Sequence, residues 1–248
     1  MAFQTIFKRY EIKYIITLEQ KEKIIEAMKD YMALDKYGRS SIRNIYFDTD
    51  SYRLISRSID KPLYKEKLRI RSYGKASADG AVFVELKKKY DGVVYKRRIA
   101  LPYEAAMDWT MQNAPCPIDT QISREIKYFL KFYKTLKPRA FLSYEREAYY
   151  QKNGGDFRVT FDDSILFRTA DLSLNSNIYG EPLLEDGQVL MEIKCSGGIP
   201  LPFVKILSKE KIYKTSFSKY GTGYNRFILP QLNRSAKNTE EKKYANHT

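Results

Sequence analysis

Residues 67–73 read KLRIRSY and residues 81–89 read AVFVELKKK. Side chains alternate between the two faces of a β-strand, so residues two apart share a face. The first segment therefore places Lys67, Arg69 and Arg71 on one face and Leu68 and Ile70 on the other. The second segment separates charged from apolar positions in the same way. Both segments predict strands of an antiparallel sheet with one apolar and one charged face.

The same alternation recurs along the chain, and Asp91-Gly92 predicts a tight hairpin between residues 81–89 and 93–101. The charged and polar positions that share a face within each segment are Arg9, Glu11 and Lys13; Glu85, Lys87 and Lys89; Lys96 and Arg98; Tyr144 and Arg146; Arg158, Thr160 and Asp162; and Glu192 and Lys194. A solvated sheet face explains any one segment, but such a face usually mixes both signs of charge. Here Arg and Lys dominate, and like charges on neighbouring strands repel one another. We therefore expect a bound polyanion to compensate them.

The composition limits the partners and the chemistry. Lys and Arg total 44 against 30 Asp and Glu, a formal net charge of +14, which leaves nucleic acid, an anionic membrane or a phosphate-rich substrate open. The only histidine, His247, lies in a polar stretch, which excludes His-based triads and zinc clusters. Cys116 and Cys195 have no metal or redox spacing. Without a membrane-spanning apolar run or a signal-peptide core, the chain is expected in the cytoplasm.

The remaining patterns predict helices outside the sheet. Helical spacing or helix-start signals appear at Leu18 to Leu34, with Thr17 as N-cap, and at 103–113, 119–136 and Ile199 to Lys211. Other strands are expected at 8–16, 42–48, 139–150, 156–162, 165–169 and 188–195. We expect one domain over residues 1–232 and a polar, disordered tail over residues 233–248. If the sheet closes into a barrel, its charged face lines the lumen.

Several short strings resemble a known family in their order and spacing. They are Tyr10-Glu11-Ile12-Lys13-Tyr14, Tyr46-Phe47-Asp48-Thr49, Leu68-Arg69-Ile70-Arg71-Ser72-Tyr73-Gly74, Val84-Glu85-Leu86-Lys87, Lys96-Arg97-Arg98, Arg158-Val159-Thr160-Phe161-Asp162, Met191-Glu192-Ile193-Lys194 and Ser218-Lys219-Tyr220. The chain resembles the polyphosphate polymerase domain of the vacuolar transporter chaperone (VTC) type, within the wider CYTH and triphosphate tunnel metalloenzymes. The resemblance extends to about Tyr224.

The resemblance implies an α+β fold, in which a closed eight-stranded antiparallel β-barrel is covered on the outside by helices. The residues that it implies as catalytic and phosphate-binding are Lys13, Arg69, Arg71, Lys87, Lys96, Arg146, Arg158 and Lys194, with Ser218 and Lys219 as further phosphate ligands. Arg98 joins the phosphate-binding set because it shares a face with Lys96. Glu192 is implied as the leading ligand of Mn²⁺ or Mg²⁺, with Glu11 and Glu85 as helpers.

The implied activity is transfer of the γ-phosphate of ATP, or of another triphosphate, to a growing inorganic polyphosphate chain. A separate membrane protein is left open as a partner, which would hold the chain at the inner face of a membrane. Arg9 replaces the first glutamate of the wider family's Glu-x-Glu-x-Lys signature, which favours polymerisation over two-metal hydrolysis. Ser216 stands where some relatives carry lysine.

Two other functions stay open from the residues. The same tunnel is able to hydrolyse inorganic or nucleoside triphosphates, and a non-catalytic protein is able to bind polyanions through it. Nucleic acid is not expected, because Tyr10, Tyr14 and Tyr95 fall on the opposite strand faces from the basic residues, whereas single-strand binders interleave aromatic and basic groups.

Overall fold

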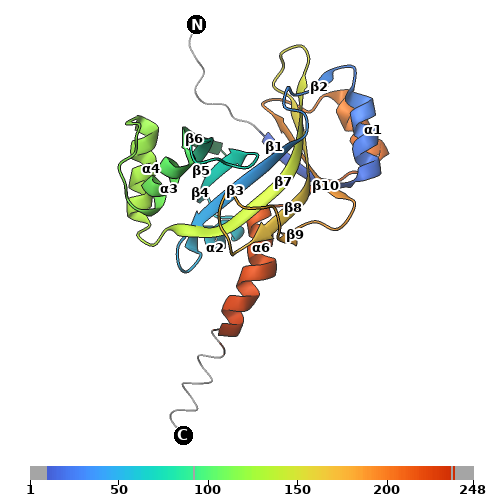
Figure 1. Ribbon diagram of the computed structural model, residues 1–248. Coiled ribbons are helices and arrows are strands. Elements are labelled where there is room, and N and C mark those ends of the chain that lie inside the picture. Colours follow the sequence, from blue (N-terminus) through green and yellow to red (C-terminus); the bar gives the residue numbers. More distant parts are fainter. Residues whose placement is uncertain (1–9, 92, 236, 238–248) are drawn as a thin grey trace.

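The structure, a computed structural model, describes residues 10–91, 93–235 and 237. An antiparallel sheet of ten strands forms its centre, and helices pack around it. The strands are β1 (Tyr10–Thr17), β2 (Met32–Leu34), β3 (Ser40–Asp48), β4 (Tyr64–Tyr73), β5 (Ala81–Tyr90), β6 (Val93–Pro102), β7 (Lys137–Gln151), β8 (Arg158–Arg168), β9 (Glu181–Pro182) and β10 (Gln188–Cys195). The predicted α+β class is confirmed. In Figure 1 the long strands cross the middle of the molecule.

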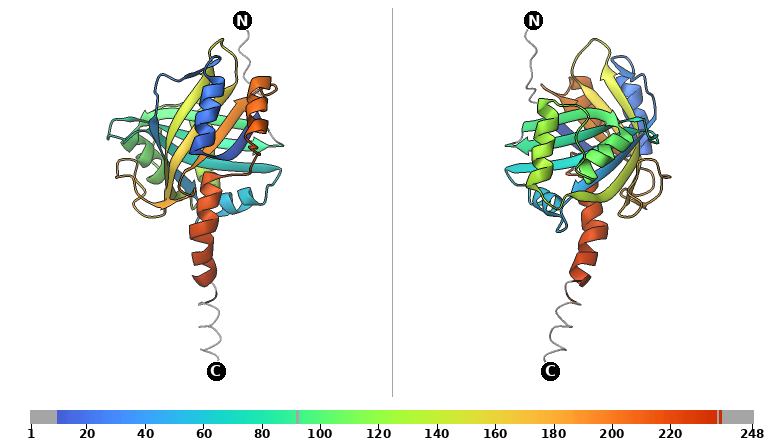
Figure 2. Two further views of the ribbon diagram at one scale, coloured as in Figure 1. Left: turned by 90° about the vertical axis from the view of Figure 1, so that its right-hand side faces the viewer. Right: turned by 60° about the vertical axis from the view of Figure 1, so that its left-hand side comes forward.

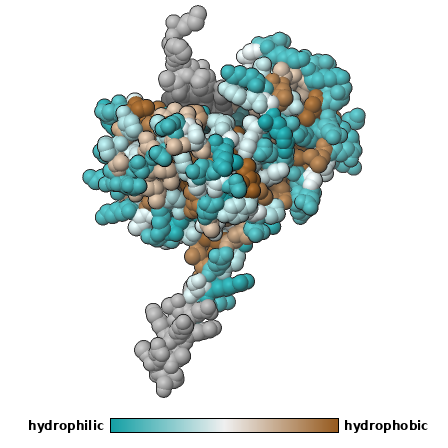
Figure 3. Space-filling model, viewed as in Figure 1, coloured by the Kyte–Doolittle hydropathy of each residue, from teal (hydrophilic) through white to brown (hydrophobic). Residues whose placement is uncertain are grey.

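Helices lie on both flanks of the sheet and at one end of it (Figures 1 and 2). They are α1 (Leu18–Met28), α2 (Arg53–Ile59), α3 (Tyr103–Met111), α4 (Gln121–Phe132), α5 (Leu201–Lys209) and α6 (Lys219–Gly223), which continues into a π-helical turn, η1 (Tyr224–Ile228). In the part of the chain that the structure describes, no helix has the length and apolar character needed to cross a membrane. The face shown in Figure 3 is mostly hydrophilic, with hydrophobic residues in small separate groups.

The sheet curls around a concave face but does not close, so the expected closed barrel of eight strands is wrong. The strands pair in the order β1-β10-β8-β7-β3-β4-β5-β6, with β2 added to β7 and β9 to β8. No ladder joins β1 to β6 within the described residues, and we call this gap the seam. The N–H of Thr215 donates to the carbonyl oxygen of Lys13 at 2.7 Å, so the segment after α5 occupies part of the edge of β1. Ladder bonds from β6 are therefore not available to that part of β1.

Three apolar clusters hold the sheet to its helices. Helices α3 and α4 cover β4–β6 and bury Trp109 and Phe129 against the apolar faces of those strands. Helices α1 and α5 lie side by side over β1, β8 and β10 (Figure 2). The third cluster lies on the concave side, where Tyr220 of α6 stacks on Tyr46 of β3 with ring centroids 4.9 Å apart. The helices after residue 218 therefore fill one end of the concave face.

Local differences from the sequence-based expectations have local causes. Thr17 is confirmed as the N-cap of α1, because its hydroxyl accepts from the N–H of Gln20 at 3.1 Å. That helix ends at Met28 rather than at Leu34, since Met32–Leu34 pairs with β7 as strand β2. The hairpin predicted at Asp91-Gly92 joins β5 to β6, with Tyr90 opposite Val93. Gly92 itself lies outside the described residues.

The C-terminal boundary also differs. Residues 229–235 are helical, so ordered structure extends into the segment expected as a disordered tail from residue 233. Residues 236 and 238–248, which include His247, lie outside the described residues, as does Arg9 at the start of the chain.

Candidate anion-binding site

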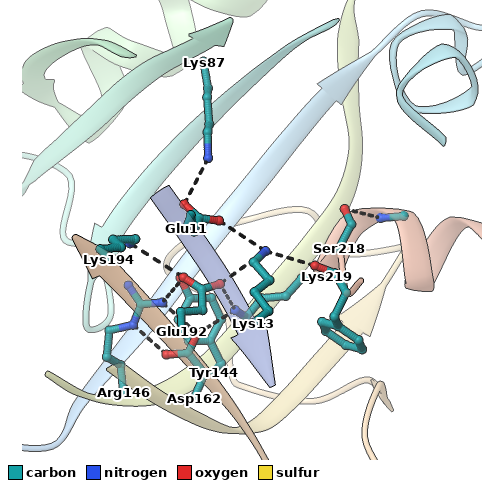
Figure 4. A network of polar contacts seen from close by, with 12 residues as sticks. Glu11, Lys13, Lys87, Tyr144, Arg146, Asp162, Glu192, Lys194, Ser218 and Lys219 are labelled. Carbon is teal, nitrogen blue, oxygen red and sulfur yellow. Dashed lines mark hydrogen bonds and ion pairs between the residues drawn. The ribbon is translucent and has the colours of Figure 1, made fainter. Parts of the chain in front are cut away.

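The concave face carries a cavity of about 470 Å³, lined by side chains from β1, β3–β7, β10 and α6. Strand register explains why these side chains meet. Glu11 lies opposite Lys194 and Lys13 opposite Glu192 in the β1–β10 pair, while Arg69 lies opposite Glu85 in the β4–β5 pair. Residues opposite one another in an antiparallel pair project from the same face. The charged faces of the separate strands therefore form one lining. Figure 4 shows the part of it around Glu11 and Glu192.

Most of the residues singled out in the sequence gather in this cavity. The lining includes Lys13, Arg69, Arg71, Lys87, Lys96, Arg146, Lys194, Ser218 and Lys219, together with Glu11, Glu85 and Glu192. Arg98 and Arg158 do not line it. Arg98 projects from the same strand face as Lys96, and its guanidinium donates to Glu85 at 2.6 Å and to the hydroxyl of Tyr73 at 3.1 Å. Arg158 is the exposed first residue of β8.

Glu192 is the centre of the first charge network (Figure 4). Its carboxylate lies 3.4 Å from the ammonium of Lys13, 3.6 Å from those of Lys194 and Lys219, and 3.9 Å from the guanidinium of Arg146. Burial disfavours the ionised form, but the surrounding cations, first Lys219 and then Lys13, hold the pKa of Glu192 well below its usual range. Glu192 is therefore charged near neutral pH.

Asp162 binds two of the cations of this network, Arg146 and Lys219. The sequence-based prediction did not include Asp162 in the site. It is fully buried, accepts two bonds from Arg146 at 2.6 and 2.7 Å, and accepts from Lys219 at 2.5 Å. Burial opposes its ionisation, while Lys219 and Arg146 lower its pKa below the usual value. The sequence did contain one indication that Asp162 belongs to the site. Asp162 shares a strand face with Arg158 and Thr160, and this face of β8 carries polar residues.

Glu85 organises the opposite wall. It accepts from Arg69 at 2.8 Å and from Arg98 at 2.6 Å, and it forms an ion pair with Lys96 at 2.7 Å. Burial disfavours its charged form, but Arg69 and its neighbours keep its pKa below the usual value. Burial also lowers the pKa of Lys96 to about 8, although Glu85 acts in the opposite direction.

Glu11 joins the two walls across the seam. Its carboxylate lies 3.4 Å from the ammonium of Lys13 and 3.5 Å from that of Lys87. Burial and the negative charge of Glu192 raise the pKa of Glu11. The positive charges of Lys87, Lys13 and Lys194 have the larger effect, and they lower this pKa to about 2. Tyr10, expected on the opposite face, also borders the cavity while remaining half exposed at the start of β1.

The chain was compared with known proteins. The model of the VTC domain family matches residues 8–228. The chain belongs to the VTC domain family. A search of curated proteins gave no match.

Two solved structures share the fold of this VTC domain at low sequence identity. One is a putative adenylate cyclase from Bacillus halodurans, with 17% identity and a TM-score of 0.54 over 90% of this chain and 97% of that one. The other is a putative adenylyl cyclase from Hippeastrum, described as having a dominant triphosphatase activity, with 16% identity and a TM-score of 0.53 over 89% and 97% of the two chains. The VTC domain is thus similar in fold to both of these proteins.

Lys67 is a further cavity residue of the VTC domain that sequence reasoning placed on the right face but left out of the site. Its ammonium donates to the hydroxyl of Ser218 at 3.2 Å. Burial first, and then the charges of Lys65, Lys13 and Lys87, lower the pKa of Lys67 to about 7. The charged form of Lys67 is therefore less favoured than that of an exposed lysine.

The carboxylates of the VTC domain set limits on a divalent metal. No group of three or more His, Cys, Asp and Glu side chains is close enough to hold a metal ion among the described residues. Glu85 is held at 2.5 to 2.7 Å by three cations, whereas the cations around Glu192 lie at 3.4 to 3.9 Å and those around Glu11 at 3.4 and 3.5 Å. Glu11 and Glu192 are ionised and lie at the cavity wall on neighbouring strands. This donor set fits Mg²⁺ or Mn²⁺, because Mg²⁺ is commonly held by one or two carboxylates plus substrate phosphates.

Proposed function

We propose that this VTC domain is a polyphosphate polymerase, which transfers the γ-phosphoryl group of ATP to the end of an inorganic polyphosphate chain in the central cavity. The observation that supports this best is the lining itself. Arginines and lysines from strands throughout the sheet converge on one cavity, and the carboxylates among them are ionised. Convergent cations without a histidine in the lining suit phosphoryl transfer, which depends mainly on positioning and charge neutralisation.

The transfer forms one bond and breaks one. A terminal oxygen of the polyphosphate chain attacks the γ-phosphorus of ATP, the bond between that phosphorus and the β–γ bridging oxygen breaks, and ADP leaves. Charge on the phosphoryl oxygens would be met by Arg69 and Arg71 on one wall and by Lys13 and Lys194 on the other. Arginine is able to engage two oxygens of one phosphate.

The lowered pKa values of the carboxylates favour a phosphate acceptor over water. Water must lose a proton to become a strong nucleophile, and a carboxylate with a pKa of about 2, such as Glu11, is a weak base. The terminal phosphate of a polyphosphate chain is already ionised near neutral pH. No general base is then required.

Glu11 and Glu192 are the residues that would hold Mg²⁺ or Mn²⁺. When bound, such an ion neutralises phosphate charge and orients the triphosphate. The protein's own contribution is to keep both carboxylates ionised through Lys13, Lys87 and Lys219.

Triphosphate hydrolysis is the second candidate, and one observation favours it. With a pKa of about 7, the amine of Lys67 is able to accept a proton from water near neutral pH. The Hippeastrum protein of similar fold is described as a triphosphatase. A bound triphosphate would raise the pKa of Lys67 again, however, and make it a weaker base, so we rank hydrolysis second.

The test incubates the protein with ATP, Mn²⁺ or Mg²⁺ and a tripolyphosphate primer, and follows chain length on a polyphosphate gel. Chains longer than the primer support polymerisation, whereas free phosphate without longer chains supports hydrolysis and contradicts our proposal. Arg69→Gln should abolish elongation. Arg124→Gln, which removes an exposed arginine of α4, is the matched control and should retain it.

A further inference from the structure

A second cavity, of about 630 Å³, adjoins the first. It lies between the strands β1, β4 and β5, helix α2 and residues 214–225. Lys13, Lys67, Lys87 and Glu11 border both cavities. The charged residues that line this second cavity and not the first are four lysines, and we call this space the lysine vestibule: Lys61, Lys65, Lys89 and Lys214.

The charge of the lysine vestibule differs in kind from that of the central cavity. The central cavity balances its arginines and lysines with three glutamates, whereas in the described part of the chain Glu11 is the only acidic residue that lines the vestibule. Among the described residues no carboxylate lies within ion-pair distance of any of the four vestibule lysines, and Lys65 contacts only the carbonyl oxygen of Ser58, at 3.4 Å. The vestibule therefore holds uncompensated positive charge.

The strand register places like charges directly against one another here. In the β4–β5 ladder Lys65 lies opposite Lys89, and Lys67 lies opposite Lys87. Like charges at directly opposite positions destabilise a sheet. Burial first, and then the charges of Lys89 and Lys87, also lower the pKa of Lys65. An arrangement that costs the empty protein stability is explained if an anion occupies the space between these strands.

We propose that the lysine vestibule is a second anion subsite, which holds the part of a condensed phosphate chain that extends beyond the phosphates bound in the central cavity. This inference rests on the proposed function and adds to it a preference for long chains over a triphosphate. Lysines suit this task, because mobile point charges hold a flexible chain without fixing the position of each phosphate. The nucleoside of ATP carries no charge that would require them.

A single-stranded nucleic acid is the competing polyanion, and the lining disfavours it. Phe217 is the only aromatic residue that borders the vestibule among those described, whereas proteins that bind single strands stack successive bases on aromatic rings.

The test compares the affinities of tripolyphosphate and of a long polyphosphate of defined length, measured by calorimetry without ATP or metal. Two variants address the vestibule. Lys65→Gln/Lys89→Gln removes the facing pair, and Lys61→Gln/Lys214→Gln removes two lysines that are exposed to solvent. Lys127→Gln/Lys131→Gln, on the exposed face of α4, is the control with the same change in net charge.

We expect the unmodified protein to bind the long chain more tightly than tripolyphosphate. Each vestibule variant should weaken long-chain binding about tenfold or more, in line with the loss of charge-assisted contacts, and leave tripolyphosphate binding unchanged. The control should change neither affinity.

Three results would overturn the inference. They are equal affinities of the unmodified protein for both ligands, an equal loss of both affinities in the vestibule variants, and displacement of the long chain by a single-stranded oligonucleotide of equal charge. Failure of the unmodified protein to bind tripolyphosphate at all would instead contradict the proposed function itself.

Discussion

Replacing Asp162 with asparagine removes a negative charge from a side chain that has no exposure to solvent. The change is nearly isosteric, but it leaves the guanidinium of Arg146 and the ammonium of Lys219 without the carboxylate that they contact at 2.6 and 2.5 Å. Removal of one partner from a buried ion pair typically costs about 3–5 kcal/mol. We therefore expect a large loss of stability from this single substitution.

We expect a loss at the lower end of that range, because Arg146 and Lys219 keep other contacts after the carboxylate is removed. Glu192 lies 3.6 Å from Lys219 and 3.9 Å from Arg146, and the ammonium of Lys219 also lies 4.5 Å from the ring centroid of Tyr144. A loss of about 3 kcal/mol corresponds to a fall in Tm of about 6–12 °C for a domain of this size.

Urea unfolding at neutral pH, with no anion added, measures the difference. Asp119→Asn is the control, because Asp119 forms an exposed ion pair with Arg124 and its loss should hardly change the unfolding midpoint. The folded-state pKa of Asp162 is lowered. The difference between the protein and Asp162→Asn should therefore be complete above the ordinary pKa of 3.8 and vanish as the pH falls through the lowered value. An Asp162→Asn variant as stable as Asp119→Asn would refute the reasoning.

Three further predictions concern the same cavity. Lys67→Met should stabilise the protein at pH values below about 7, where the folded state must carry the lysine charge, and the gain should shrink as the pH rises from about 7 to 10.5. Urea midpoints at several pH values measure this gain, and a difference that does not change with pH would contradict a lowered pKa of Lys67. Glu192→Gln should abolish turnover. The affinity for tripolyphosphate, measured by calorimetry, should stay the same or rise, because one negative charge facing the anion is lost. A fall in this affinity would contradict a role of Glu192 confined to binding the metal. Tripolyphosphate at 100 times its Kd should stabilise the folded protein by about 2.7 kcal/mol, and a melting curve without any shift would argue against a preformed site.

The charged faces of the strands could be predicted because alternation is a local property. Each of Arg69, Glu85, Lys87 and Glu192 lies in the lining where a period of two placed it. The grouping of these faces into one cavity followed from the resemblance and from the expected curling of the sheet. Asp162 was not predicted as a site residue, because its cationic partners come from segments distant in sequence, in β7 and α6.

Other features depend on contacts that no local pattern signals. Part of the free edge of β1 pairs with Thr215, which is distant in sequence from β1 and β6. Met32 continues the helical spacing of apolar residues after Met28, but its backbone pairs with Gln151. Helix α2 begins after Tyr52 with no side-chain cap of its own, and the carboxylate of Asp48, from the preceding strand, accepts from the N–H groups of Leu54 and Ile55 at 2.8 and 2.9 Å.

An unclosed sheet has two free edges, and a free edge is a template on which another chain can add a strand and begin to aggregate. The residues at the two edges of the seam reduce this tendency to aggregate in two ways. The bond from Thr215 to Lys13 takes up part of the edge of β1 from within the same chain. On β6 the consecutive residues Lys96, Arg97 and Arg98 place positive charge along the other edge strand, so a second copy of that edge is repelled. The protein therefore keeps its concave face open at one side without offering a bare edge to its neighbours.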